Sequence, residues 1–159
     1  MESKTSAARA RAMRWALIGS LLGTIAMDLV MVVESVILGM PVHGFFALIG
    51  SVVGGGAPIG AVIHFLVGST LGLLFGLAVD QIRFLSIDSV HKGTWLGLLV
   101  GLVTIPLGCV PFALLVGVSI LELVSFSFIP HLVWGAVMGV VVGYGLGSGP
   151  RSVELPAAS

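Results

Sequence analysis

Four ionisable side chains stand within long apolar stretches of this sequence. His64 and His131 each lie in a stretch of their own, whereas Asp28 and Glu34 share a third. An ionisable side chain at membrane depth is costly, so it is usually buried against protein, paired or functional. Imidazole nitrogens and carboxylate oxygens ligate zinc, copper and iron, and they also relay protons. We therefore predict a metal- or proton-binding site formed by His64, His131, Asp28 and Glu34.

A purely structural role for the two histidines competes with this prediction. Each imidazole can donate a hydrogen bond to a main-chain carbonyl and so hold helices together. Haem bound between the two histidines is a narrower alternative, because it needs the width of a porphyrin between their helices. The cofactor is therefore left open between a transition metal and haem. No nucleophile–base pair and no phosphate-binding loop is visible, so we expect no catalytic residues.

Both histidines begin the same glycine motif. His64 is followed at four-residue intervals by Gly68, Gly72 and Gly76, and His131 by Gly135, Gly139 and Gly143. The two motifs superpose at a constant offset of 67 residues. Residues four apart lie on one face of a helix, and a stripe of glycines lets another helix approach closely in lipid. We predict that these glycines pack helices, that the two stripes face each other, and that both histidines point toward their shared interface.

The composition shows what surrounds these groups. Of 159 residues, 57% are hydrophobic and only 9% are charged, and the mean hydropathy is +1.19. An ordinary soluble domain carries about 25% charged residues. With seven basic and seven acidic residues, the chain also lacks the basic excess of a nucleic-acid-binding protein. A soluble enzyme, a nucleic-acid binder, a disordered tail and, with the lone Cys109, a disulfide scaffold are excluded, which leaves an integral membrane protein.

Four segments are long enough to cross a bilayer as helices. A span needs about 20 mainly apolar residues, and the segments are residues 15–38, 57–79, 94–118 and 129–146. The basic residues all fall on one side of this four-span arrangement, namely Lys4, Arg9, Arg11, Arg14, Arg83, Lys92 and Arg151. This bias places both termini in the cytoplasm and the protein in the plasma membrane. Residues 1–14 then form a basic cytoplasmic N-terminus, 15–148 the transmembrane domain and 149–159 a cytoplasmic tail.

The predicted fold is an all-α, polytopic integral membrane protein. Its four transmembrane helices form a duplicated two-helix hairpin, because the histidine–glycine motif recurs in the second and fourth spans. Pro106 and Pro111 should kink or break the third span. Residues 45–53 are apolar but too short to cross, so we expect them to lie in the outer interface or to form a re-entrant segment.

The paired motifs, His64-Phe-Leu-Val-Gly and His131-Leu-Val-Trp-Gly, give the chain a family resemblance. It resembles a group of small bacterial and archaeal four-helix membrane proteins of unknown function, loosely YagU-like. The resemblance covers most of the chain. It implies a polytopic inner-membrane protein and carries over no catalytic residues.

Two functional hypotheses follow from the sequence. The leading one is a non-enzymatic accessory or structural subunit of a membrane protein complex, including a membrane enzyme complex. Its partners would be the lipid bilayer and other membrane helices or further copies of the chain, and nucleic acid is not expected. The alternative is a metal-ion or proton binding or transport protein with a histidine–carboxylate site on the outer side. A haem-binding redox subunit is a further option.

Overall fold

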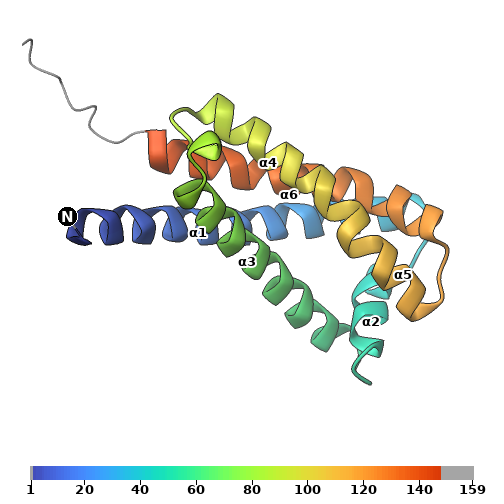
Figure 1. Ribbon diagram of the computed structural model, residues 1–159. Helices are drawn as coiled ribbons and strands as arrows, with labels where there is room; N and C mark the ends of the chain where they lie inside the picture. The colour runs from blue at the N-terminus through green and yellow to red at the C-terminus, as the bar shows by residue number, and fades with distance from the viewer. Residues whose placement is uncertain (1, 148–159) are drawn as a thin grey trace, which may run out of the picture.

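The computed structural model describes residues 2–147, and over this range every regular element is a helix (Figure 1). In chain order the elements are α1 (Glu2–Ile37), α2 (Gly44–Ser51), α3 (Ala57–Gln81), η1 (Arg83–Leu85), α4 (Val90–Thr104), η2 (Ile105–Cys109), α5 (Val110–Val116) and α6 (Ile120–Gly147). The predicted tail, residues 149–159, lies outside the described residues.

Four stretches of these helices are long and apolar enough to cross a membrane. They are Ser6–Ile37, Ala57–Gln81, Val90–Val116 and Ile120–Gly147. The predicted number of apolar helices is therefore confirmed for residues 2–147. The fourth helix begins at Ile120 rather than at residue 129, because Pro130 is accommodated inside α6 and does not start it. The residues left between the third and fourth predicted spans, 119–128, are thus almost entirely helical.

The basic N-terminal segment is also helical and continues directly into the first apolar stretch. Two of its arginines are tied to other helices. The Arg9 guanidinium lies 3.0 Å from a carboxylate oxygen of Asp80. Arg11 donates two hydrogen bonds to the main-chain carbonyl of Gly145. The start of α1 is therefore fastened to the C-terminal ends of α3 and α6.

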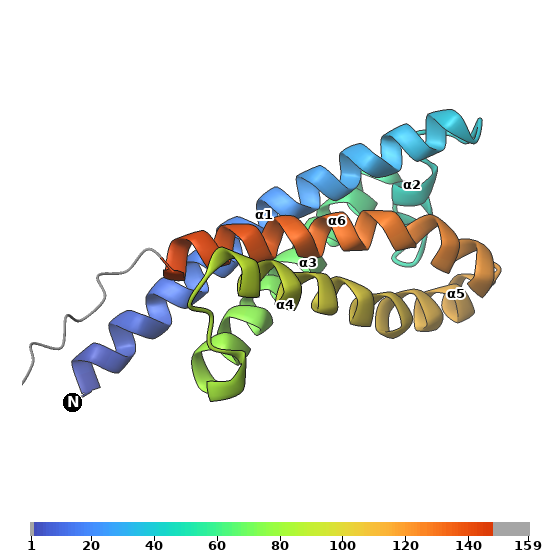
Figure 2. The same cartoon turned by 90° about the horizontal axis from the view of Figure 1, so that it is seen from above.

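The long helices are arranged around α1 and α6. Helix α6 lies between α1 and α4, and α3 packs on another side of α1 (Figures 1 and 2). Helices α3 and α6 do not pack extensively against each other. The prediction that their glycine stripes face each other is therefore wrong. Each stripe is occupied by a different neighbour, α1 for α3 and α4 for α6.

The α1–α3 interface pairs glycines with small side chains. Gly68 faces Thr24, Gly72 faces Ser20 and Gly76 faces Ala16. Each step of four residues forward on α3 matches a step of four back on α1, as two antiparallel helices require. A methyl group added to any of these glycines would meet a side-chain atom of α1 first. The glycine stripe therefore acts as a groove that receives small side chains.

The α4–α6 interface is closer, because glycines stand on both sides of it. Gly93, Gly97 and Gly101 of α4 lie against the main chain of Gly139, Gly135 and His131 of α6. A methyl group added at Gly97 or Gly135 would meet a main-chain carbonyl oxygen of the other helix. The two backbones are therefore in direct contact, a mode of association that suits helices in lipid.

The predicted interruption of the third span is confirmed. Pro106 lies within η2, a five-residue π-helix, and Pro111 lies in the first turn of α5. Proline removes a main-chain donor and clashes with the preceding turn, so the regular helical pattern gives way here. Helix α5 then ends at Gly117, whose φ of 73° is in the left-handed region. The apolar segment that is too short to cross forms α2, which packs against α3.

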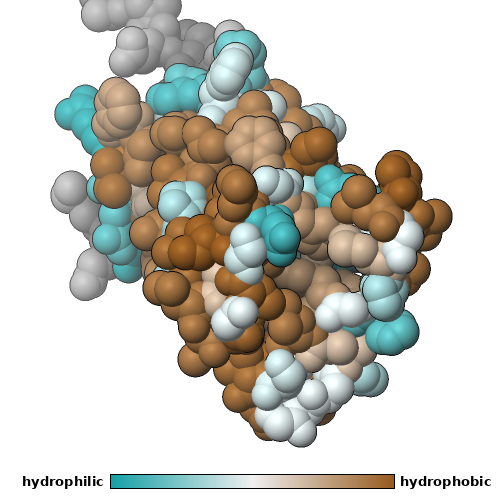
Figure 3. Space-filling view, turned by 90° about the vertical axis from the view of Figure 1, so that its right-hand side faces the viewer, coloured by the Kyte–Doolittle hydropathy of each residue, from teal (hydrophilic) through white to brown (hydrophobic). Residues whose placement is uncertain are grey.

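Large apolar side chains remain exposed along all four long helical stretches. Leu29, Leu66, Leu107 and Leu121, one on each stretch, are between 62% and 75% exposed. Apolar residues cover most of the face shown in Figure 3. An outer surface of this kind is consistent with contact with the hydrocarbon core of a bilayer.

Candidate functional site

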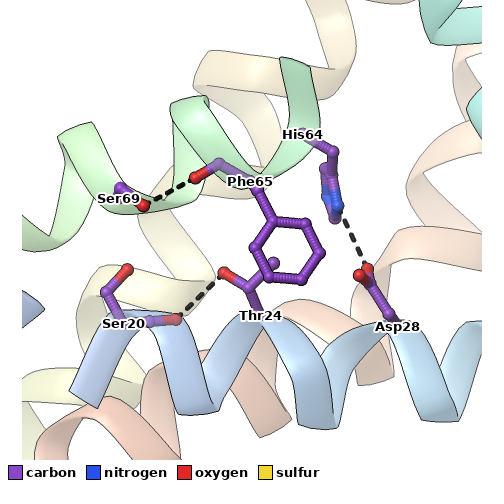
Figure 4. Close-up of polar contacts among 6 residues, drawn as sticks. All are labelled: Ser20, Thr24, Asp28, His64, Phe65 and Ser69. Atoms are coloured by element: carbon purple, nitrogen blue, oxygen red, sulfur yellow. Dashed lines mark hydrogen bonds and ion pairs between the residues drawn. The ribbon is translucent and has the colours of Figure 1, made fainter. Parts of the chain in front are cut away.

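Asp28 and His64 meet at one end of the α1–α3 interface. They continue the register of the glycine pairs, because His64 stands one turn before Gly68 and Asp28 one turn after Thr24. His64 Nδ1 lies 3.1 Å from Asp28 Oδ1, and the side chains are 11% and 18% exposed (Figure 4). The register of the glycine pairs thus places an imidazole beside a carboxylate between two apolar helices.

Within residues 2–147, His64 Nδ1 and Asp28 Oδ1 have only each other as polar partners. The two atoms lie within ion-pair distance, but they are not aligned as a regular hydrogen bond. Phe45 and Phe46 of α2 approach the imidazole edge-on, with ring centroids at 5.6 and 5.8 Å. Helix α2 therefore covers the pair with aromatic rings and limits the approach of water.

His131 is held in a different way. Its Nδ1 lies 2.8 Å from the main-chain carbonyl oxygen of Ser127, one turn earlier on α6. A carbonyl only accepts, so Nδ1 carries the hydrogen and donates it. In the neutral ring, Nε2 is then an acceptor. On the α4 side, Gly101 lies against the main chain of His131 and offers no side chain to the imidazole.

Both imidazoles line one cavity of about 330 Å³. Its walls come from α1, α2, α3, α4, η2, α5 and α6, and most of their surface is apolar. Polar residues are few, and among them are Thr24, Thr104 and Ser127. The structure therefore brings His64 and His131 to a shared space, although their glycine stripes do not meet.

The comparisons with known proteins give one positive finding. The model of a family of unknown function, DUF6789, matches residues 10–152. The chain belongs to this family. The match spans the Asp28–His64 pair, His131 and all the residues that line the cavity. No curated protein and no solved structure gives a significant match, and the YagU-like resemblance is not confirmed.

Glu34 is the predicted site residue that lies apart from the others. It borders a second pocket together with Glu122, Phe126 and Met40. Glu34 stands six residues beyond Asp28, which on an α-helix is about 9 Å along the axis and about 120° around it. Within residues 2–147 no group of three or more histidine, cysteine, aspartate or glutamate side chains is placed to hold a metal ion.

Several residues of the site were not anticipated from the sequence. Trp134 is 2% exposed, lines the cavity and has a buried indole Nε1 without a hydrogen-bond partner in the described range. The phenylalanines of α2 were assigned to an interfacial or re-entrant segment and not to the site. One available signal was the spacing of Ser20, Thr24 and Asp28, which repeats every four residues and matches the spacing that begins at His64. That match predicts the α1–α3 register.

Proposed function

We propose that this DUF6789 protein is a four-span integral membrane protein that binds and exchanges a proton at the Asp28–His64 pair. The observation that carries the proposal is the 3.1 Å contact between an imidazole and a carboxylate of two apolar helices. The pair has no net charge whether the proton resides on the aspartate or makes the histidine cationic. Gain or loss of one proton leaves a net charge in an apolar setting, where it is costly.

The free-energy cost of a net charge makes the proton content of the pair sensitive to its surroundings. The proton content of the pair must respond to whatever fills the adjoining cavity, because an added dipole or charge there changes the free energy of the charged state. From the pair toward the C-terminal end of α3, the α1–α3 interface is filled by Thr24 against Gly68 and by Ser20 against Gly72. We infer that protons exchange on the cavity side and do not flow along this interface.

The metal and accessory-subunit hypotheses have less support. A stable metal site generally needs three or four protein ligands, and only Asp28 and His64 of the four predicted ligands are in contact. The subunit hypothesis drew in part on glycine faces that would pack against the chain's own repeat and against partner helices. In the structure the predicted packing glycines of α3 and α6 are already covered, by α1 and α4 respectively.

Orientation and ancestry complete the proposal. Arg9, Arg11 and Arg14 lie near the start of α1, and Arg83 and Lys92 flank the turn between α3 and α4 at the same end of the bundle (Figure 1). Because cytoplasmic loops carry an excess of basic residues, this distribution supports an orientation with this end inside and the cavity toward the outside. The recurrence of the motif, with each glycine stripe packed on the preceding long helix, supports descent from a duplicated hairpin.

Histidine nuclear magnetic resonance on the full chain in lipid nanodiscs tests the proton site. With ¹⁵N-labelled imidazoles, the titration curve of His64 should change clearly in Asp28→Asn, because coupled groups titrate as a pair. Glu34→Gln is the matched control, since it neutralises another carboxylate of α1 that borders a different pocket. A His64 titration curve that is the same in the unaltered protein and in Asp28→Asn would contradict the proposal.

A further inference from the structure

We infer that the cavity binds a lipid-soluble molecule with a flat ring that carries at least one hydroxyl group, that is, a phenol or a quinol. This inference rests on the proposed function, because it takes the Asp28–His64 pair as part of the binding site.

The imidazole of His131 offers an acceptor, because its Nδ1 donates to the Ser127 carbonyl and Nε2 of the neutral ring then accepts. The imidazole of His64 offers a donor, because its Nε2 carries a hydrogen in both uncharged states of the Asp28–His64 pair. Neither Nε2 makes a hydrogen bond in residues 2–147, and neither is among the fully buried unpartnered atoms. Since both residues line the cavity, one acceptor and one donor are available there.

Trp134 contributes ring surface to the cavity rather than a hydrogen bond. Its Nε1 is fully buried and has no partner among the described residues, so a ligand in the cavity does not reach it. A hydroxyl group both donates and accepts, and therefore it can satisfy His131 Nε2 and His64 Nε2 together.

The walls of the cavity define the rest of the ligand. Phe45, Phe112 and Trp134 contribute aromatic surface, and aliphatic side chains such as Ile49 and Leu123 supply most of the remainder. No lysine or arginine is among the described lining residues. A phosphate or carboxylate would therefore enter without a counter-charge, and the same holds for the two carboxylates of haem. An uncharged aromatic ring matches these walls by stacking and by burial of apolar area.

The size of the cavity agrees with a single ring. Ligand pockets commonly have volumes of about 300–1,000 Å³, and this one has about 330 Å³. That volume holds a substituted benzene ring and a few alkyl carbons. A ligand of this kind reaches the site from the bilayer, where it concentrates because it is apolar.

Calorimetric titration with a short-chain alkylhydroquinone tests the inference, with the full chain in nanodiscs and empty nanodiscs as the blank. The matched probe is the dimethyl ether of the same compound, which keeps the ring and chain but has no O–H. We expect saturable binding of the hydroquinone and about tenfold weaker binding of the ether, from the loss of a hydrogen bond to a buried acceptor. Equal affinity for the two, or no saturable binding, would overturn the inference without any variant having to fold.

Variants then locate the site. His131→Phe should weaken hydroquinone binding about tenfold for the same reason, whereas His91→Phe should leave it unchanged, because His91 is exposed and pairs with Trp95. Unchanged binding in His131→Phe would also contradict the inference. If His64 titrates with Asp28 and no hydroquinone binds, the ligand class is wrong and the proton site stands. If hydroquinone binds but His64 titrates independently of Asp28, the proton site is wrong.

Discussion

The two long-helix interfaces of this protein start from the same motif and end in different structures. On α3, the glycines that follow His64 receive the side chains of Ala16, Ser20 and Thr24. On α6, the glycines that follow His131 lie directly against the glycine-rich main chain of α4. The first interface is therefore made of side chains set in a groove, and the second of two backbones in contact.

The difference explains why the two histidines have different neighbours. A groove that accepts side chains also accepts Asp28, so His64 acquires a carboxylate partner at 3.1 Å. The backbone contact leaves no room for a side chain opposite His131, which turns instead to the carbonyl of Ser127. The motif supplies close packing in both halves, and the residues on the partner helix determine the chemistry.

The largest effect should come from the backbone contact. In Gly97→Ala, the new methyl group meets the carbonyl oxygen of Gly135, which no rotamer change can move. We expect a loss of about 3 kcal/mol in the free energy of unfolding, at the upper end for overpacking. Unfolding by denaturing detergent, followed by circular dichroism, measures it. Gly108→Ala is the control, since nothing lies within 4 Å of its added methyl. A loss no greater than that of the control would show that α4 and α6 are not in backbone contact.

A smaller and reversible effect is expected at the α1–α3 interface. The methyl group of Gly76→Ala would come 2.7 Å from Ala16 Cβ, so we expect a loss of about 1–2 kcal/mol. Here the neighbour is a side chain, and the compensating substitution Ala16→Gly removes it. The same unfolding assay should recover most of the lost stability in the double variant. If Ala16→Gly and Gly76→Ala destabilise additively, the two residues do not face each other.

The sequence predicted the number of apolar helices because length and hydropathy alone determine which segments can cross a bilayer. It did not predict which helices pair. Small residues repeat every four positions on α3, α4 and α6, and a similar stripe containing Ser20 and Thr24 runs along α1. Such stripes favour close contact without specifying a partner, so the choice of α3 with α6 was one of several that the pattern allows.

A similar limit applies to the candidate site, because a costly side chain in an apolar stretch does not specify which residue it faces. Asp28 and His64 were singled out as costly groups in apolar stretches, and they lie 3.1 Å apart. Glu34 satisfied the same criterion, but helical rotation turns it to another pocket. Trp134 gave no signal, because a tryptophan in an apolar helix usually serves packing, and only the structure shows that it lines the cavity.

The α1–α3 register underlies both proposals, and a disulfide tests it most directly. An ideal Cβ built on Gly68 lies 3.7 Å from Thr24 Cβ, within the range of about 3.5–4.5 Å that disulfides span. In a Cys109→Ala background, mild oxidation of Thr24→Cys/Gly68→Cys in membranes should give an intramolecular disulfide, detected by mass spectrometry. Thr24→Cys/Val67→Cys, which moves one thiol to a half-exposed neighbouring position, should give little. Absence of the disulfide in the first pair, or equal yields in both, would contradict the account.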